Sequence, residues 1–301
     1  MLYVKGNACC QPQITKKMQN NPPGTGGYVK MYHRPGETYV YFCVVDNISG
    51  CMTNRKRPRS RDHTAARNDL LYGAHAVAAA LANPARRCLQ LWATSNALSR
   101  HGKVIENSGI VTERVRPDVL DRKLGAGAVH QGLLLEATPL EEPSLHDLAP
   151  GGVLVVLDQV SDPHNVGAVL RSCAAFGARG LILTERHSPS NTGVLAKAAS
   201  GALEHVPLIR VTNLVRALGS IAELGHVRIG LDGDAGQDLA DVDLSGGVAL
   251  VLGAEGKGLR RLTAEHCDRL AHLATPGPLS SLNVSNAAAV SLYICTANPG
   301  R

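Results

Sequence analysis

Amide, carboxylate and guanidinium side chains gather in three short segments in the second half of this 301-residue sequence. The first segment is Asp-Pro-His-Asn at 162–165, and Arg171 follows it. The second is the glycine-rich run 253–258, which contains Glu255, and the third is the Ser- and Asn-rich run 280–288. An arginine can bind a polyanion, whereas a carboxylate in a glycine-rich loop suits a neutral or cationic ligand.

The glycine-rich segment differs from the common nucleotide-binding loops. A P-loop requires G-x-x-x-x-G-K-[ST], but Gly258 follows Lys257 and Val251 stands where the first glycine belongs. A Rossmann loop is also excluded, because the glycines are spaced G-x-x-G-x-G and Glu255 would place a carboxylate beside a pyrophosphate. Considered alone, the segment is equally well explained as a glycine-rich turn with an exposed glutamate.

The segments that flank these residues predict an α/β domain with a buried parallel sheet. The apolar runs 153–158 and 248–252 are typical of strands covered on both faces, and the loops after them lie where open α/β sheets bind ligands. Residues 166–176 repeat apolar side chains at helical spacing, and 180–184 predicts the next strand. Arg171 lies off the apolar stripe of this helix, so it is either a solvated arginine or a contact for a polyanion.

Three motifs, in this order, resemble the signature motifs of the SpoU (TrmH-like) branch of the SPOUT RNA methyltransferases. They read D-x-x-x-D-P-H-N-V-G-A-V-L-R-S from Asp158, L-G-A-E-G-K-G-L from Leu252 and S-S-L-N-V-S-N-A-A-A-V from Ser280. Upstream, L-Y-G-A-H-A-V at 71–77 and H-Q-G at 130–132 resemble the small substrate-binding domain of the 23S rRNA guanosine 2′-O-methyltransferases. The resemblance covers most of the chain after residue 70.

The resemblance implies a homodimer with two α/β domains in each chain. It implies a smaller RNA substrate-binding domain at 69–137 and a parallel-sheet SPOUT domain at 152–298 tied in a deep trefoil knot. The prolines and acidic residues of 138–151 indicate a linker between the two domains. The residue pattern alone predicts an ordinary doubly wound sheet, because chains rarely thread their own loops. Only the resemblance supplies the knot.

The reaction that the resemblance implies is methylation of a ribose 2′-hydroxyl in RNA. S-adenosylmethionine (AdoMet) is the implied methyl donor, no metal is implied, and the expected substrate is a guanosine of 23S rRNA. A tRNA guanosine or an rRNA adenosine is the alternative substrate. The non-enzymatic alternative is an inactive ribosome-associated RNA-binding protein.

The resemblance also assigns roles to the polar residues of the three motifs. Arg171 is expected to contact the substrate phosphate and to assist removal of the hydroxyl proton, although an arginine locked as a cation is better suited to steering the phosphate. Asn165 and Asn283 are expected to orient the ribose and the loops, and Glu255 to order its loop or bind Asn165. The predicted catalytic residues are Arg171, Asn165, Glu255, Asn283 and Ser281.

Backbone groups and apolar side chains from three loops are expected to hold AdoMet, with its adenine packed against apolar residues. Considered alone, Leu273 and Leu282 would be core leucines, so their assignment rests on the resemblance. Asn286 departs from the family, which usually places an apolar residue after Ser285. The predicted AdoMet contacts are Gly253, Leu273, Leu282, Leu252 and Ser285.

Positive charge is concentrated before residue 71, where 11 Lys and Arg face 4 Asp and Glu. Residues 71–301 carry 20 Lys and Arg against 21 Asp and Glu, so RNA contact there must use local patches. The basic run 55–61 either binds phosphates or is a solvated tail. Few aromatic residues follow residue 70, which favours phosphate and shape contacts over base stacking. The predicted RNA-contacting residues are Arg171, Arg86, Arg87, Arg114, Arg116 and Arg260.

Residues 1–68 are expected to be a basic, disordered extension. Nothing in the first 51 residues matches the family, and Met52 immediately precedes the basic run, so we hypothesise that translation begins at Met52. The eight cysteines contain no C-x-x-C pair, which favours reduced structural thiols over metal ligands. No apolar run is long enough to span a bilayer and no signal peptide is evident, so we expect a soluble cytoplasmic protein without membrane contact.

Overall fold

The computed structural model describes residues 68–125, 127–186, 193–278 and 281–297, together with two strands nearer the N-terminus. The chain divides into two compact units, Met1–Asp62 and His63–Arg301. The first unit contains β1 (Tyr28–Arg34) and β2 (Glu37–Cys43), which pair antiparallel.

β1 and β2 lie inside the segment for which the sequence predicts disorder. Three other features of that segment lie outside the described residues. These are the hypothetical start at Met52, the basic run 55–61, and the cysteines Cys9, Cys10 and Cys51.

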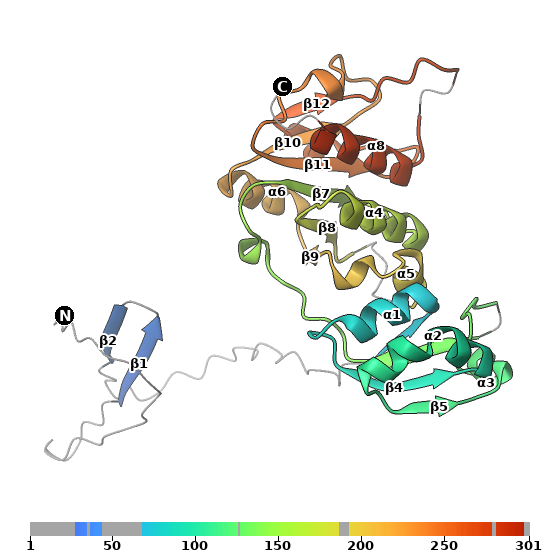
Figure 1. The fold of residues 1–301 in the computed structure, drawn as a ribbon. Coiled ribbons are helices and arrows are strands. Elements are labelled where there is room, and N and C mark those ends of the chain that lie inside the picture. Colours follow the sequence, from blue (N-terminus) through green and yellow to red (C-terminus); the bar gives the residue numbers. More distant parts are fainter. Residues whose placement is uncertain are drawn as a thin grey trace, which may run out of the picture. The chain divides into compact units, whose positions relative to one another are not determined.

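The second unit begins with a four-stranded sheet in the order β3-β6-β4-β5 (Figure 1). β6 pairs antiparallel with both β3 and β4, whereas β4 and β5 are parallel. The side chains of Leu133, Leu134 and Leu135 in β6 are at most 1% exposed, because helices and neighbouring strands cover this strand on both faces. The elements are β3 (Asp69–Tyr72), α1 (Ala74–Ala82), β4 (Cys88–Ala93), α2 (Ser95–Ser108), β5 (Thr112–Arg114), α3 (Pro117–Leu124) and β6 (Leu133–Ala137).

Helix α2 has defined signals at both ends. The hydroxyl of Thr94 accepts a hydrogen bond from the Ala97 N–H at 3.4 Å, and the helix ends at Gly109, whose φ is 62°. The Thr94 N–H donates to the carbonyl of Gly132 at 2.9 Å, which fixes the start of α2 to the turn before β6. A side chain at position 132 would place its Cβ 2.3 Å from the Thr94 hydroxyl, so this close approach requires glycine.

A six-stranded parallel sheet forms the rest of the second unit, in the order β12-β10-β11-β7-β8-β9. The strands are β7 (Val153–Asp158), β8 (Gly180–Thr184), β9 (Leu208–Val211), β10 (His226–Leu231), β11 (Gly247–Gly253) and β12 (Arg269–Ala271). The helices are α4 (Pro163–Ala175), α5 (Gly193–Ala198), α6 (Leu214–Glu223), α7 (Arg261–Glu265) and α8 (Val284–Ala297). Short 3-10 turns are η1 (Leu145–Asp147), η2 (Ala202–Glu204) and η3 (Leu239–Asp241). The predicted α/β class is confirmed.

Helices cover both faces of the parallel sheet. Alternate residues of β7 enter different apolar clusters, Val155 with the α4 and α8 side and Leu154 with α6. Helices α4 and α8 pack side by side on one face (Figure 1). This double cover explains why β7 and β11 read as continuous apolar runs.

The strand order reverses between β7 and β11. From β7 the chain moves outward through β8 and β9, then crosses to β10 on the other side and returns to β11, directly beside β7. After β12 at the edge, the chain crosses again to α8, which packs against both β11 and β7. The carboxyl ends of β7 and β11 therefore form a topological switch point, where doubly wound proteins bind ligands.

A buried ion-pair network joins the two sheets of the second unit. The guanidinium of Arg86, whose side chain is 2% exposed, pairs with Glu204 at 2.7 Å and Asp69 at 3.1 Å. It also donates to the carbonyl of Thr138 at 2.9 Å. The prediction that Arg86 contacts RNA is therefore wrong, because its charge is neutralised within the protein and withheld from the surface.

Within the described ranges, no helix is both long enough and apolar enough to cross a membrane. The four cysteines described with their surroundings, Cys88, Cys173, Cys267 and Cys295, are all unpaired. Burial raises the pKa of Cys173 to about 12, so this thiol stays protonated and behaves as a small apolar side chain.

Candidate active site

The three polar segments meet at the switch point. Gly253 at the end of β11 lies in register with Asp158 at the end of β7, so the loops that leave these strands start side by side. The third segment reaches the same place as the chain enters α8. Residues far apart in the sequence are thus placed together by the sheet order.

Glu255 links all three segments through its carboxylate. Its Oε1 accepts hydrogen bonds from the side-chain amides of Asn165, at 3.0 Å, and Asn283, at 2.6 Å. The Asn283 amide also lies 3.2 Å from Oδ1 of Asn165, to which it donates. The predicted pairing of Glu255 with Asn165 is present in the structure, and Asn283 completes a triangle of side chains.

The two asparagines sit at helix starts. Asp162 caps α4 by accepting the His164 N–H at 3.0 Å, and Pro163 occupies the first turn, where its missing N–H costs nothing. Asn283 precedes α8, and its Oδ1 accepts the N–H of Ser285 at 2.8 Å and the hydroxyl of the same residue at 2.5 Å. Ser285 therefore supports Asn283 directly.

The glycine-rich segment forms a turn that closes on itself. The Gly258 N–H donates to the Ala254 carbonyl at 2.9 Å, and Gly256 and Gly258 have φ of 74° and 62°. At Gly253 an added Cβ would lie 2.1 Å from the backbone carbon of Gly258. A side chain is therefore excluded at Gly253, while Glu255 is exposed in the turn that follows it.

Asp158 and Arg260 form a second link between the loops, which the sequence analysis missed. The Asp158 side chain is 0% exposed, and it accepts the backbone N–H of Arg260 at 3.1 Å and its guanidinium at 2.7 Å. The Arg260 side chain remains 45% exposed, so the pair does not exclude its predicted RNA contact. The aspartate that opens the first motif was the available signal.

Gln159 follows Asp158 in a left-handed conformation, with φ of 62°. Such a backbone costs about 1–3 kcal/mol for a residue other than glycine and clusters at functional sites. No feature of the sequence marks it, because glutamine has no preference for this region.

Arg171 is exposed on α4, six residues after Asn165. Across the described residues, no hydrogen bond or ion pair engages its guanidinium, which leaves it free for an external anion. Arg87 and Arg114 are also exposed, with the Arg114 Nε donating to Ser95 at 2.8 Å. Arg116 pairs with Asp118 at 3.1 Å and its side chain is 85% exposed.

The predicted donor contacts differ in burial. Leu252 is 2% exposed, and Leu273 is half-buried against the core. Leu282 is 40% exposed, so its interpretation as a core leucine is wrong. Ser281 is exposed beside it. An exposed leucine together with the glycine-rich turn supplies the apolar and backbone surface that a flat, partly polar ligand requires.

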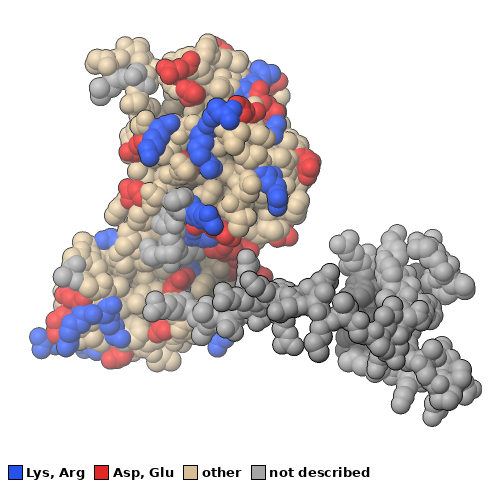
Figure 2. Space-filling model, turned by 180° about the vertical axis from the view of Figure 1, so that it is seen from behind, with Lys and Arg blue, Asp and Glu red and all other residues tan. Residues whose placement is uncertain are grey.

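On the face seen in Figure 2, Lys and Arg side chains are scattered among acidic ones and form no single patch. In the parts of the chain with described side chains, no group of three or more His, Cys, Asp and Glu could hold a metal ion. The fold and site define an α/β protein whose switch point brings together loop backbone, amides and apolar side chains, the groups of a ligand site.

Comparison with known proteins places the chain in a family. Residues 152–293 match the model of the SpoU rRNA Methylase family, and residues 70–143 match a model described as RNA 2′-O ribose methyltransferase substrate binding. The chain belongs to the SpoU rRNA methylase family.

The relatives agree with this assignment. The chain is 40% identical over 234 residues to the 23S rRNA (guanosine-2′-O-)-methyltransferase RlmB of Pasteurella multocida, covering 74% of this chain and 95% of the relative. It is 42% identical over 238 residues to the enzyme of the same name from Xylella fastidiosa, covering 75% and 95%.

Solved structures share the fold. The SpoU methyltransferase AviRb from Streptomyces viridochromogenes, in complex with AdoMet, has a TM-score of 0.67 at 23% identity. That likeness covers 78% of this chain and 92% of the other.

Proposed function

We propose that the protein transfers a methyl group from AdoMet to the ribose 2′-hydroxyl of a guanosine in 23S rRNA. The observation that carries this function is the convergence of Glu255, Asn165 and Asn283 at the switch point. Relatives named as 23S rRNA guanosine 2′-O-methyltransferases, about 40% identical over three quarters of the chain, support the substrate.

The switch-point loops fit AdoMet. The turn offers the backbone of Gly253, where no side chain fits, and Leu282 offers an exposed apolar surface. Bound AdoMet would supply a methyl group on a cationic sulfonium, which agrees with a loop that carries a carboxylate. The residues proposed to hold it are Gly253, Leu252, Leu273, Leu282 and Ser285.

The ribose hydroxyl is a weak nucleophile, so this chain's residues must position it and favour loss of its proton. Arg171 binds the adjacent phosphate and stabilises negative charge on the hydroxyl oxygen while remaining protonated. Asn165 and Asn283, held by Glu255, orient the ribose, and the exposed hydroxyl of Ser281 lies next to them in the chain.

The proposed assembly is a homodimer in the cytoplasm. Two apolar side chains of α8, Val290 and Tyr293, are 42% and 60% exposed, and the Tyr293 ring lies 6.3 Å from that of Phe176. Such a patch favours burial against a second copy. Sedimentation analysis should give twice the mass of one chain, and a monomer at micromolar concentration would contradict the dimer.

The crossing from β12 to α8 is proposed to pass through an earlier loop, which gives the trefoil knot. The return of the chain to β11 and β7 after the edge strand supports this topology. The domain bounds 69–137, 138–151 and 152–298 are proposed with it.

Methyl transfer from labelled AdoMet to different RNAs tests the function. The protein should label 23S rRNA transcribed without modifications and leave tRNA unlabelled. Label on tRNA alone would show that tRNA, and not rRNA, is the substrate. No label on any RNA, with intact AdoMet binding, would favour an inactive RNA-binding protein.

A further inference from the structure

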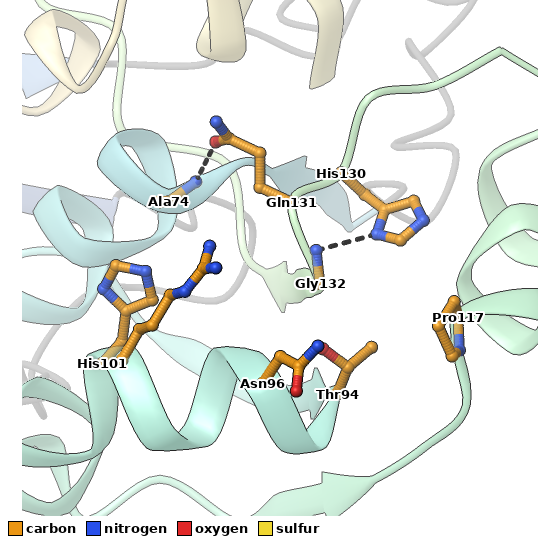
Figure 3. Close-up of a pocket in the computed structure, with 9 residues that line it drawn as sticks. Ala74, Thr94, Asn96, His101, Pro117, His130, Gln131 and Gly132 are labelled. Atoms are coloured by element: carbon orange, nitrogen blue, oxygen red, sulfur yellow. Dashed lines mark hydrogen bonds between the residues drawn. The ribbon is translucent and has the colours of Figure 1, made fainter.

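A polar pocket of 320 Å³ lies in the small domain, away from the three motifs. Side chains of α2, including Asn96 and His101, line one side, and the turn of His130, Gln131 and Gly132 lines the other (Figure 3). The volume is near the lower end of the ~300–1,000 Å³ found for ligand sites. It is large enough for one compact polar group.

Three side chains of α2 lie at the pocket without partners. Throughout the residues that the structure describes, no hydrogen bond or ion pair engages the side chains of Asn96, Arg100 or His101, and all three line the pocket. Arg100 is exposed and His101 half-buried. The pocket thus offers one permanent cation, one amide with donor and acceptor, and one imidazole.

The opposite wall is rigid and strained. Gln131 has a φ of 53°, a left-handed conformation unusual outside glycine, and its Oε1 accepts the Ala74 N–H at 2.8 Å. Nδ1 of His130 accepts the Gly132 N–H at 2.9 Å, and Nε2 lies 3.2 Å from Asp121. These contacts hold the turn in one conformation, and they leave the Gln131 amide group available as a donor.

The lining favours a nucleotide over other small groups. A guanidinium binds phosphate oxygens, the amide of Asn96 offers a donor and an acceptor to a base edge, and the amide of Gln131 offers a further donor. The base must be unpaired, because pairing occupies its Watson–Crick edge and the deep, narrow major groove of an A-form helix keeps side chains from its Hoogsteen edge. Arg114, at the end of β5, supplies further positive charge beside the start of α2, where it donates to Ser95, whereas Arg116 is paired with Asp118.

We infer that this pocket binds one unpaired nucleotide of the RNA substrate, with its phosphate on Arg100 and its base edge against Asn96 and Gln131. The inference rests on the proposed function and adds a second RNA-binding point to it. The pocket adjoins the junction of the two sheets, because a Cβ at Gly73 would lie 3.4 Å from Gln131 and 3.5 Å from Lys197 of α5. A nucleotide held here would help set where the target ribose falls.

Binding and kinetics of pocket variants test the inference on the full chain. Arg100→Ala and Asn96→Ala should each weaken 23S rRNA binding and raise the KM for RNA about tenfold, which corresponds to about 1.4 kcal/mol. The kcat and the AdoMet Kd should stay unchanged. Arg100→Ala should also lower the slope of log Kd against log salt by roughly 0.7–0.9, the value of one phosphate contact.

The matched control is Lys103→Ala, which removes a positive charge from the same helix outside the pocket. Its KM should change less than twofold. Equal effects of Lys103→Ala and Arg100→Ala, or no effect of either pocket variant, would overturn the inference. Free guanosine monophosphate should not compete with rRNA, and competition at the Kd of the RNA would overturn the assignment to an RNA nucleotide.

The outcome for the pocket can be separated from that for the proposed function. RNA binding is measured without methyl transfer. If the wild type methylates no RNA but Arg100→Ala weakens RNA binding, the pocket inference is supported and the proposed reaction is refuted. If the protein methylates rRNA and the KM for RNA is unchanged in both variants, the proposed reaction is supported and the pocket inference is refuted.

Discussion

The carboxylate of Glu255 links the loops of the site, and the substitution Glu255→Ala tests this role. The substitution removes two hydrogen bonds, to the amides of Asn165 at 3.0 Å and Asn283 at 2.6 Å. Hydrogen bonds to charged groups contribute about 1.5–3 kcal/mol when buried. Because Glu255 is exposed, we expect a combined loss of about 1–2 kcal/mol. The freed loops would then have to be ordered when AdoMet binds.

Isothermal titration should therefore show that the AdoMet Kd of Glu255→Ala rises about tenfold, since 1.4 kcal/mol corresponds to a factor of ten. Turnover should fall as well. The control is Glu265→Ala, which removes only the exposed pair with Arg261 on α7 and should leave the Kd unchanged. A Glu255→Ala protein that is folded and binds AdoMet within twofold of the wild type would refute the role of this triangle.

Three further substitutions test other parts of the structure. Arg171→Ala should abolish turnover and spare the AdoMet Kd, because the residue is proposed to contact the substrate phosphate and not the methyl donor. Its control is Arg179→Ala, which removes an exposed arginine just before β8, and unchanged turnover in Arg171→Ala would remove the assigned role. Arg86→Met should lower the free energy of unfolding, measured with urea, by about 3–5 kcal/mol, because it leaves two buried carboxylates without their partner. The control is Arg122→Ala, which breaks an exposed ion pair and should cost less than about 1 kcal/mol. Asp268→Asn should destabilise the protein at neutral pH. The hydrogen bond from Arg228 lowers the pKa of Asp268. The carboxylate therefore stabilises the folded protein above the ordinary aspartate pKa, and this stabilisation is lost as the pH falls through the lowered pKa. A difference in stability between Asp268→Asn and the wild type that persists at the lowest pH would contradict this role.

Much of the parallel sheet could be predicted from local pattern. The apolar runs 153–158 and 248–252 correspond to β7 and β11, because strands covered on both faces carry few polar residues. The helix predicted at 166–176 begins earlier, at Pro163, since Asp162 caps it and proline suits the first turn. Apolar spacing starts only at Val166, so the pattern by itself leaves the polar first turn of the helix out.

The wrong prediction for Arg86 and the missed link between Asp158 and Arg260 both involve ion pairs whose partners are distant in sequence. Arg86 stands beside Arg87 in a basic pair, and nothing local shows that its partner Glu204 lies 118 residues away. Asp158 and Arg260 are 102 residues apart and meet only because β11 returns beside β7. The burial of a charged residue depends on the tertiary fold, so the sequence pattern alone could not reveal either ion pair.

The pairing of Glu255 with Asn165 was predicted as one of two roles, and it rested on the resemblance. Periodicity places each residue in a loop but does not bring the loops together. The sheet order does so, and it also placed Leu282 at the surface against the interpretation of a core leucine.

The most direct test of the central claim is nucleoside mass spectrometry of unmodified 23S rRNA after incubation with the protein and AdoMet. The predicted result is 2′-O-methylguanosine at one site, which disappears in Arg171→Ala. Methylation on a base, or no methylated nucleoside although the protein binds both AdoMet and rRNA, would contradict the assignment of ribose methylation to this site.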